Sequence, residues 1–540
     1  MQTNTNVAPD TATNSVVENS RISTPVGILS IISFIIGAAL VALPYSAYHM
    51  GIFTIPYHIF NCVCAIYSIH LFLKCAEVTG HDSTARIGCE VLGKSSLYLV
   101  NSLQIIVFGM LPIAYLIIIG QSLSSMLRWI DKIDSKYRHS LGDQWFSIVV
   151  LSLLLAPWIF KRKFEDLKVI GVILFSTTII FATSFFFLCV FFKTPWLDHY
   201  QNINWNKLMK PEFDNEFFAS LSTPLVAYGF QSAFFPVYNS LKEKNYTQGI
   251  ISTILAMTFC FLIYMMVIFA SLPTFGEEIC RDVLHNLHSD GNRHSWQGIL
   301  LKSLYIVILI GHFPYVFLMA NKSLLGIIAL LCIRGETQNE TENIESGESF
   351  QNPHVRSRLV PTERVQLLSA ENNQQYEAGQ LHKLAAKTQD YDELNHTDES
   401  MIEIENSKPS DTNLEFGSNS LIQVLSAEDT NVETVSSSWR RLIYYSVTIS
   451  LYLVIVLSAC FIHNVESVIR LVGSIGNSFL NFTFPGLFYF VIMRRHGVNN
   501  SWWQLGLALT LCIYGIVTGI LLTGFNIFVH PEVRVKECLD

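Results

Sequence analysis

A short run of small residues and a proline marks the first place in this chain where chemistry could occur. The run IIGAALVALPYSAYHMG places Gly37, Ala39 and Pro44 inside an apolar segment of membrane-spanning length. Pro44 removes a backbone donor and disturbs the preceding turn, while the small residues allow close approach to the main chain. Because an unpaired backbone group is costly in hydrocarbon, such a break survives where the freed groups line a cavity or meet a ligand. Tight packing of small residues between helices is the alternative.

A second interrupted segment favours the first interpretation. The run FFASLSTPLVAYGFQSAFFPVYNSLK, residues 217–242, holds Pro224, Gly229 and Pro236 within one crossing. Interrupted helices at matching positions of two halves predict a transporter site near the midplane. The N–H groups that start a half-helix suit a carboxylate, and the opposing carbonyls suit an ammonium, so an amino-acid zwitterion would satisfy both. The candidate substrate-binding residues are Gly37, Ala38, Ala39, Leu40, Ala42, Thr223, Ala227, Tyr228, Gly229 and Gln231.

Composition indicates the elements that position these residues. Half of the 540 residues are hydrophobic, 14% are charged and the mean hydropathy is +0.37, which excludes an ordinary soluble protein. We expect an all-α membrane protein with 11 transmembrane helices, in which spans 1–5 and 6–10 form an inverted 5+5 repeat and spans 1 and 6 are broken. The predicted spans are 26–48, 52–78, 97–127, 145–160, 168–193, 216–238, 248–275, 299–332, 440–464, 468–493 and 502–529.

Basic residues in short loops predict the orientation. The clusters KRKFEDLK, KEK and MRRHG follow spans 4, 6 and 10, which places the N-terminus in the cytoplasm and the C-terminus outside it. No cleaved signal peptide is expected, because the N-terminal tail lacks a basic region followed by a short apolar core. The predicted regions are a disordered cytoplasmic tail 1–23, spans 1–8 in 24–333, a disordered acidic cytoplasmic insertion 334–438, spans 9–11 in 439–529 and an extracytoplasmic tail 530–540.

The acidic insertion carries two short patterns that resemble sorting signals. Residues 334–437 hold 20 Asp and Glu against 7 Lys and Arg, a composition that cannot bury enough apolar surface to fold alone. Within it, ERVQLL (Glu363–Leu368) and YDEL (Tyr391–Leu394) have the spacing of motifs read by coat adaptors, although such short patterns also arise by chance. They favour an endosomal or vacuolar membrane, with the plasma membrane as the alternative.

Four motifs in order give the chain a family resemblance. Besides the run at residues 35–51, VAYGFQSAFFPVYNSLK, HFPYVFLMANKSL and HNVESVIRLVGSIGNSFLNFTFPGLFYF are similar to the sixth, eighth and tenth helices of the amino acid/auxin permease family. The resemblance covers residues 24–333 and 439–529 and implies a LeuT-like inverted-repeat fold and amino-acid transport. The chain departs from the family pattern at Ala39, where a second Gly is usual, and at Phe230 and Gln231, where Cys-His is frequent.

The same resemblance bears on the driving ion. It places His312 where sodium-coupled members use a Thr or Ser hydroxyl to coordinate sodium, and Ser33 at the position of the polar first-helix residue that assists it. Since an imidazole titrates near neutrality and ligates sodium poorly, we predict proton coupling through His312, with sodium symport as an alternative. A His that only bonds a neighbouring helix is the other interpretation. A gradient is the expected energy source, and we expect no cofactor, metal site or nucleic-acid partner. The expected partners are an amino acid substrate and the lipid bilayer, and the chain is expected to be a monomer.

No enzyme is expected, because the chain has no HExxH, GxSxG or phosphate-binding Gly loop. A nutrient sensor that binds an amino acid and signals through the insertion is the stronger rival. Further polar span residues could line the route or bond between helices: Asn101, Gln104, Asn477, Asn481, His58 and His70. Glu466 and Arg470 have the spacing of a local helix pair. Cys280 and Cys538 lie outside the spans and either pair or remain free thiols.

Overall fold

The structure is a computed structural model that describes part of the chain. The described residues are 23–128, 144–160, 168–191, 208–242, 244–287, 296–345, 437–462, 464–498 and 501–528. The N- and C-terminal tails apart from Ser23, both sorting patterns and Cys538 lie outside them. The chain divides into two compact units, residues 1–327 with 431–540, and residues 328–430. The first unit holds the candidate site. In the second, the described residues continue one helix from Ile328 to Glu345, beyond the predicted end of span 8.

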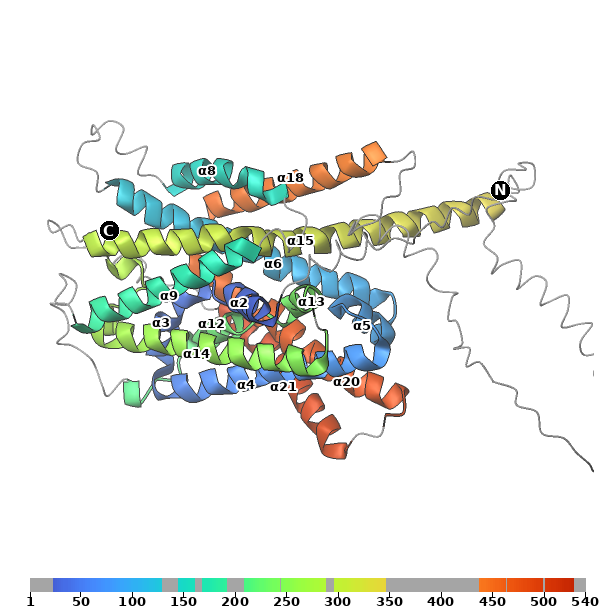
Figure 1. Ribbon diagram of the computed structural model, residues 1–540, viewed down its shortest axis with the longest axis horizontal. Coiled ribbons are helices and arrows are strands. Elements are labelled where there is room, and N and C mark those ends of the chain that lie inside the picture. The colour runs from blue at the N-terminus through green and yellow to red at the C-terminus, as the bar shows by residue number, and fades with distance from the viewer. Residues whose placement is uncertain are drawn as a thin grey trace, which may run out of the picture. The chain divides into compact units, whose positions relative to one another are not determined.

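The described regular elements are helices (Figure 1). Within the described ranges, eight helical stretches are long and apolar enough to cross a membrane, and Thr24–Ile35 and Gln144–Phe160 are shorter apolar stretches. The main elements are α2 (Thr24–Ile35), α3 (Ala39–Met50), α4 (Thr54–Thr79), α5 (Thr84–Leu92), α6 (Ser95–Arg128), α8 (Gln144–Leu155), α9 (Lys168–Phe191), α11 (Asn215–Ser220), α12 (Ser222–Ala227), α13 (Gln231–Asn239), α14 (Tyr246–Phe275), α15 (Trp296–Glu345), α18 (Ser437–Phe461), α19 (Val465–Leu471), the π-helical segment η8 (Val472–Thr483), α20 (Phe484–Arg495) and α21 (Trp502–Phe528). Short 3₁₀ turns are η1 (Gly51–Phe53), η2 (Ala156–Phe160), η5 (Gly276–Glu278) and η6 (His285–Leu287).

Large apolar side chains are exposed along several of these helices. Leu153 on α8, Phe461 on α18 and Trp502 and Ile520 on α21 are each more than 60% exposed. In water such surface would be a liability, whereas in a bilayer it faces lipid. The exposed apolar faces therefore agree with an integral, multi-pass membrane protein.

Helices α11, α14 and α19 carry side-chain caps at their N-termini. Asp214 accepts a hydrogen bond from the Phe217 N–H at the start of α11, and Asn245 accepts one from the Gln248 N–H at the start of α14. Asn464 accepts from two N–H groups at the start of α19. These oxygens satisfy N–H groups that have no partner within the helix. The short helices inside the bundle lack this feature, as shown below.

The short helices of spans 1 and 6 pack among the long ones. Figure 1 shows α2, α12 and α13 among α4, α6, α9 and α14. Helix α2 packs on α9 and α14, while α12 packs on α3 and on η8. A Cβ atom at Gly473 of η8 would collide with the carbonyl oxygen of Ser222, which starts α12. Glycine at this position therefore lets span 10 approach the main chain of span 6 directly.

Candidate functional site

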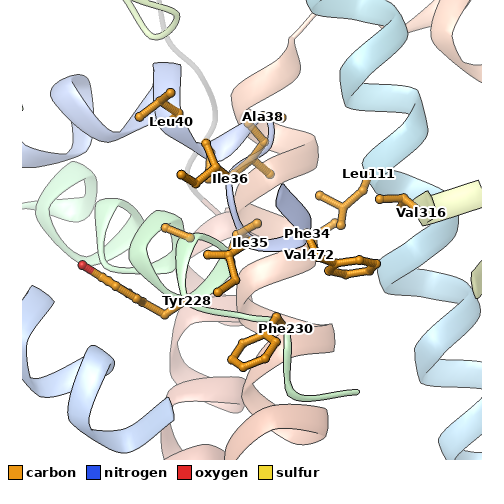
Figure 2. Packing of buried hydrophobic residues seen from close by; sticks show 14 of the residues in the cluster. Phe34, Ile35, Ile36, Ala38, Leu40, Leu111, Tyr228, Phe230, Val316 and Val472 are labelled. Carbon is orange, nitrogen blue, oxygen red and sulfur yellow. The ribbon is translucent and has the colours of Figure 1, made fainter. Parts of the chain in front are cut away.

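Both predicted helix interruptions are present. Helix α2 ends at Ile35, Ile36 has φ −82° and ψ 100°, and α3 starts at Ala39. In span 6, α12 ends at Ala227 and α13 starts at Gln231, with Tyr228 at φ −103° and ψ 9°. Figure 2 shows the bend of the first interruption beside the second, where it labels Tyr228 and Phe230. The two predicted breaks thus lie at Gly37 and Gly229, whereas Pro44, Pro224 and Pro236 lie inside the half-helices that flank them.

The half-helices that begin at the two interruptions, α3 and α13, have no side-chain cap at their N-termini. Ala38 precedes α3 and Phe230 precedes α13, and neither side chain accepts a hydrogen bond from the N–H groups that follow. The first N–H groups of a helix have no intrahelical acceptor and carry the positive end of the helix dipole. Two uncapped starts buried inside the bundle are therefore positioned to receive an anionic group.

Three side chains from other helices bond the carbonyls freed at the end of α2. His312 Nε2 lies 2.9 Å from the Phe34 oxygen, the Tyr264 hydroxyl 3.2 Å from the Ile35 oxygen and the Tyr305 hydroxyl 2.8 Å from the Gly37 oxygen. These donors come from α14 and α15. The freed acceptors of span 1 are therefore paired through spans 7 and 8.

Tyr264 also joins the two interruptions. Its hydroxyl lies 2.9 Å from the carbonyl oxygen of Ala227, the last residue of α12, as well as near the Ile35 oxygen. A tyrosine hydroxyl has one proton, so the two carbonyls share a single donor. The side chain is fully buried. Any motion that separates the two broken stretches must therefore alter this contact.

Gly229 is closely approached by span 10. The Asn477 Nδ2 donates a hydrogen bond to the Leu225 oxygen at 3.3 Å, and a Cβ atom on Gly229 would lie 2.6 Å from Asn477 Cγ. Gly37 has a similar constraint, because a Cβ atom there would lie 2.7 Å from the Tyr115 hydroxyl oxygen. Both glycines allow side chains of neighbouring spans to reach the broken backbone.

The two candidate ion-coupling residues lie at the end of α2. A carbonyl oxygen can only accept, so His312 Nε2 carries the proton toward Phe34. The other nitrogen, Nδ1, lies 2.7 Å from the Tyr115 hydroxyl and can accept from it. Ser33 donates to the Gly171 oxygen at 2.8 Å. Both residues are buried, and a neutral imidazole satisfies both contacts of His312.

Several buried polar atoms of spans 6 and 10 have no partner in the described part of the chain. They are the Thr223 Oγ1, both amide atoms of Gln231 and both amide atoms of Asn481. All three side chains are fully buried. Buried polar atoms are nearly always hydrogen-bonded, so such a set marks a place for water or a polar ligand. Gln231 is the first residue of α13, whose start is uncapped.

The remaining candidate substrate-binding residues are buried. Leu40, Ala42 and Ala227 are nearly or fully inaccessible, and the Leu40 N–H donates to the Gly37 oxygen at 3.2 Å. The Tyr228 hydroxyl lies 3.1 Å from His58 Nδ1 of α4. Tyr228 thus uses its side chain to bond another helix, which leaves its main chain as the part available at the break.

The other polar span residues bond between helices. Ser323 donates to Gln104 at 3.0 Å, and His70 Nδ1 lies 2.6 Å from the Tyr246 hydroxyl. Like His58 and Asn477, these residues therefore make hydrogen bonds between helices, which was one of the two roles predicted for them. Asn101 packs beside Gly326, at 3.3 Å from the position of an added Cβ.

The predicted pair of Glu466 and Arg470 belongs to a larger ionic cluster. Arg470 contacts Glu466 at 2.5 Å and Glu216 at 2.7 Å, while Arg281 contacts Glu466 at 2.9 Å and Glu216 at 3.5 Å. Glu466 and Arg470 are buried. The pair is therefore more than a local helix contact, because it connects α19 to α11 and to the segment after α14.

Three tyrosines and one cysteine add to what the sequence indicated. Tyr264 and Tyr305 contact carbonyl oxygens of broken span 1, and Tyr115 contacts His312, which bonds the same span. In the sequence, these tyrosines are distinguished only by a polar hydroxyl within an apolar span. Cys280 is in a disulfide, so the interpretation of a free thiol was wrong for Cys280. Cys538 itself lies outside the described residues.

The chain is similar to a known protein family and to several solved structures. The chain matches the family described as transmembrane amino acid transporter protein over residues 20–528. Among solved structures it is similar to a substrate-bound, outward-open Na⁺-coupled sialic acid symporter, with TM-score 0.44, 13% identity and coverage of 93% of this chain and 90% of that one. It is also similar to a mutant of the Eremococcus coleocola manganese transporter, with TM-score 0.37, 12% identity and 96% coverage of each chain. The family match confirms the resemblance seen in the motifs: the chain belongs to the transmembrane amino acid transporter family.

Proposed function

We propose that this protein is a secondary active carrier that moves amino acids across a membrane by alternating access, coupled to protons. The observation that carries the proposal is the pair of buried helix interruptions joined by the Tyr264 hydroxyl. Main-chain groups of both stretches are close enough to share one donor. A solute bound between them would contact both, and its binding would be sensitive to their relative position.

The chemistry of the two stretches fits a zwitterion. The uncapped starts of α3 and α13 offer N–H groups and positive dipole ends to a carboxylate. An ammonium group requires acceptors, and the carbonyls at the end of α2 supply them once a tyrosine donor turns away. The unpartnered Thr223 and Gln231 atoms would pair with polar atoms of the substrate or with water.

Proton coupling is favoured over sodium coupling by the contacts at the end of α2. A sodium ion needs several oxygen atoms with free lone pairs. Here the Phe34 oxygen already accepts from His312, and the Ser33 hydroxyl is directed to Gly171. His312 offers no oxygen to a sodium ion at this position, and its side chain occupies the place of a hydroxyl ligand. A proton needs no such set of oxygen atoms.

We further propose eleven spans with an inverted 5+5 repeat and a cytoplasmic N-terminus. The eleventh span adds α21 to the ten of the repeat. The disulfide of Cys280 supports this orientation, because the proposed topology puts the loop between spans 7 and 8 outside the cytoplasm, where disulfides persist. The proposed location is the endosomal or vacuolar membrane. We propose that the protein is a monomer and that coat adaptors bind the patterns Glu363–Leu368 and Tyr391–Leu394.

Uptake into proteoliposomes tests the proposal. Purified full-length protein is reconstituted and offered a panel of labelled amino acids under an imposed proton gradient, an imposed sodium gradient at clamped pH, or neither. We expect accumulation of at least one amino acid with the proton gradient. Accumulation that follows sodium alone would overturn the coupling, and absence of flux for every amino acid would overturn the function.

A further inference from the structure

The segment between α14 and α15 is buried although it belongs to a loop. Ile279, Val283, Leu284 and Leu287 are each at most 5% exposed. Connecting loops usually run over the surface, where water satisfies their backbone. The segment Ile279–Leu287 instead packs into the protein, and the Val283 N–H donates to the Val41 oxygen of α3 at 3.1 Å. It therefore contacts α3, the second half of broken span 1.

Asp282 lies within this buried segment. The residue is 3% exposed, and its Oδ1 accepts from the Leu284 N–H at 2.9 Å. Its Oδ2 is buried and has no hydrogen-bond partner among the described residues. A buried carboxylate oxygen without a partner is unfavourable when charged. The same atom is the natural place for a proton, because a protonated carboxyl group carries no charge to be desolvated.

Asp282 is linked to the broken stretch from two sides. Its chain neighbour Val283 bonds Val41 in α3. On the other side, Tyr305 of α15 is close enough to experience the charge of Asp282, and the hydroxyl of Tyr305 donates to the Gly37 oxygen at 2.8 Å. A change of charge at Asp282 thus acts on both ends of the stretch from Gly37 to Val41.

We propose that Asp282 is the proton-binding residue that couples transport to a proton gradient, by holding the segment Ile279–Leu287 packed against α3 when protonated and releasing it when ionised. The proton comes from water on the extracytoplasmic side and binds the unpartnered Oδ2. This inference rests on the proposed carrier function. It assigns the coupling to a group outside the spans, in addition to or instead of His312.

The charged groups around the segment allow this role. Lys302 of α15 is the cation that acts on Asp282, and its Nζ donates to the Ser125 hydroxyl at 2.9 Å. Arg281, next to Asp282, is engaged by Glu216 and Glu466 instead. On α3, Tyr45 lies under the two arginines of that ionic cluster, and His49 acts on Glu216. The remaining titratable neighbours are Tyr305 and, on the segment itself, His285.

The direction of the pH effect follows from burial. Burial raises the pKa of Asp282 to about 7, against the opposing effects of the Leu284 N–H and Lys302. A released, hydrated carboxyl group has a pKa of about 3.9. The packed state therefore binds an extra proton between these values. It is favoured at acid pH and loses this advantage as the pH rises through 7, by up to roughly tenfold per pH unit.

The first test compares Asp282→Asn with Glu277→Gln, a neutralisation of an exposed carboxylate in the same loop. Full-length proteins in proteoliposomes are assayed for gradient-driven uptake and for counterflow exchange, at extracytoplasmic pH from 5.5 to 8. Asn mimics the protonated carboxyl, so Asp282→Asn should lose at least tenfold in gradient-driven accumulation and most of its pH dependence, yet keep exchange. Glu277→Gln should behave as wild type. Proton-driven accumulation by Asp282→Asn with the wild-type pH profile would overturn the inference.

A second variant keeps the inference testable if Asp282→Asn does not fold. Lys302→Met removes the cation that favours the charged carboxylate, so the midpoint of the pH profile should move to higher pH. Hydrogen exchange of the peptide covering residues 279–287 should follow the same midpoint without any substrate, with protection at acid pH. An unmoved midpoint in Lys302→Met, or exchange that is independent of pH in the wild type, contradicts the inference. If wild type carries no amino acid at all, the carrier function itself fails, which is a distinct result.

Discussion

Replacing Tyr264 with Phe tests the contact that joins the two helix interruptions. The change removes the hydroxyl that lies near the Ile35 and Ala227 oxygens but keeps the buried ring, so no cavity forms. One buried carbonyl or both then lack their donor, which costs about 1–3 kcal/mol. This corresponds to roughly a 5- to 150-fold fall in the population of this conformation relative to those in which the carbonyls are solvated.

The assay pairs transport with stability. Tyr264→Phe and Tyr67→Phe are reconstituted, and initial uptake rates at saturating amino acid are compared with the thermal midpoint of the detergent-solubilised proteins. Tyr67 is a half-buried tyrosine of α4 whose hydroxyl makes no hydrogen bond to the described residues, so it controls for loss of a phenol group within a span. We expect a lower midpoint and slower uptake in Tyr264→Phe alone. Wild-type values for both measurements in Tyr264→Phe would refute the idea that this hydroxyl couples the broken stretches.

Three further predictions concern other parts of the site. Gly229→Ala places a Cβ atom 2.6 Å from Asn477 Cγ, so it should lose about 1–3 kcal/mol and most uptake, whereas Gly109→Ala, with open space around its Cβ, should match wild type in the same uptake assay. Glu466→Gln leaves two arginines with one carboxylate fewer in a buried cluster, and a loss of about 3–5 kcal/mol should appear as a lower thermal midpoint; an unchanged midpoint would mean that the cluster contributes little. Deleting residues 346–436 should leave amino acid flux in proteoliposomes intact if the protein is a carrier. A sensor that signals through this insertion would show no flux before the deletion and would lose its signalling output after it.

The sequence predicted the breaks because their causes are local. Gly37 and Gly229 act on the backbone within a few residues of themselves, so their effect can be inferred without knowing the neighbours. The family was likewise predictable, because four motifs occur in the expected order along the chain. Apolar runs of sufficient length predicted the long helices, although α15 continues to Glu345 through a polar stretch that contains Gly335.

The contacts that complete the site depend on distant segments. Tyr264, Tyr305 and His312 reach one carbonyl stretch from two different spans, and no spacing rule relates them to Ile35 or Gly37. The pairing of Glu466 with Arg470 followed from their i, i+4 spacing, but Glu216 and Arg281 come from elsewhere in the chain. Their participation becomes visible only once the helices are packed together.

The ionic cluster of Glu216, Arg281, Glu466 and Arg470 has two positive and two negative members, which makes it electrically neutral as a whole. A transmembrane voltage does work only on net charge, about 2.3 kcal/mol per elementary charge for each 100 mV. If these four side chains move together during a transport cycle, the voltage neither assists nor opposes them. These four side chains should then add nothing to the current measured during turnover.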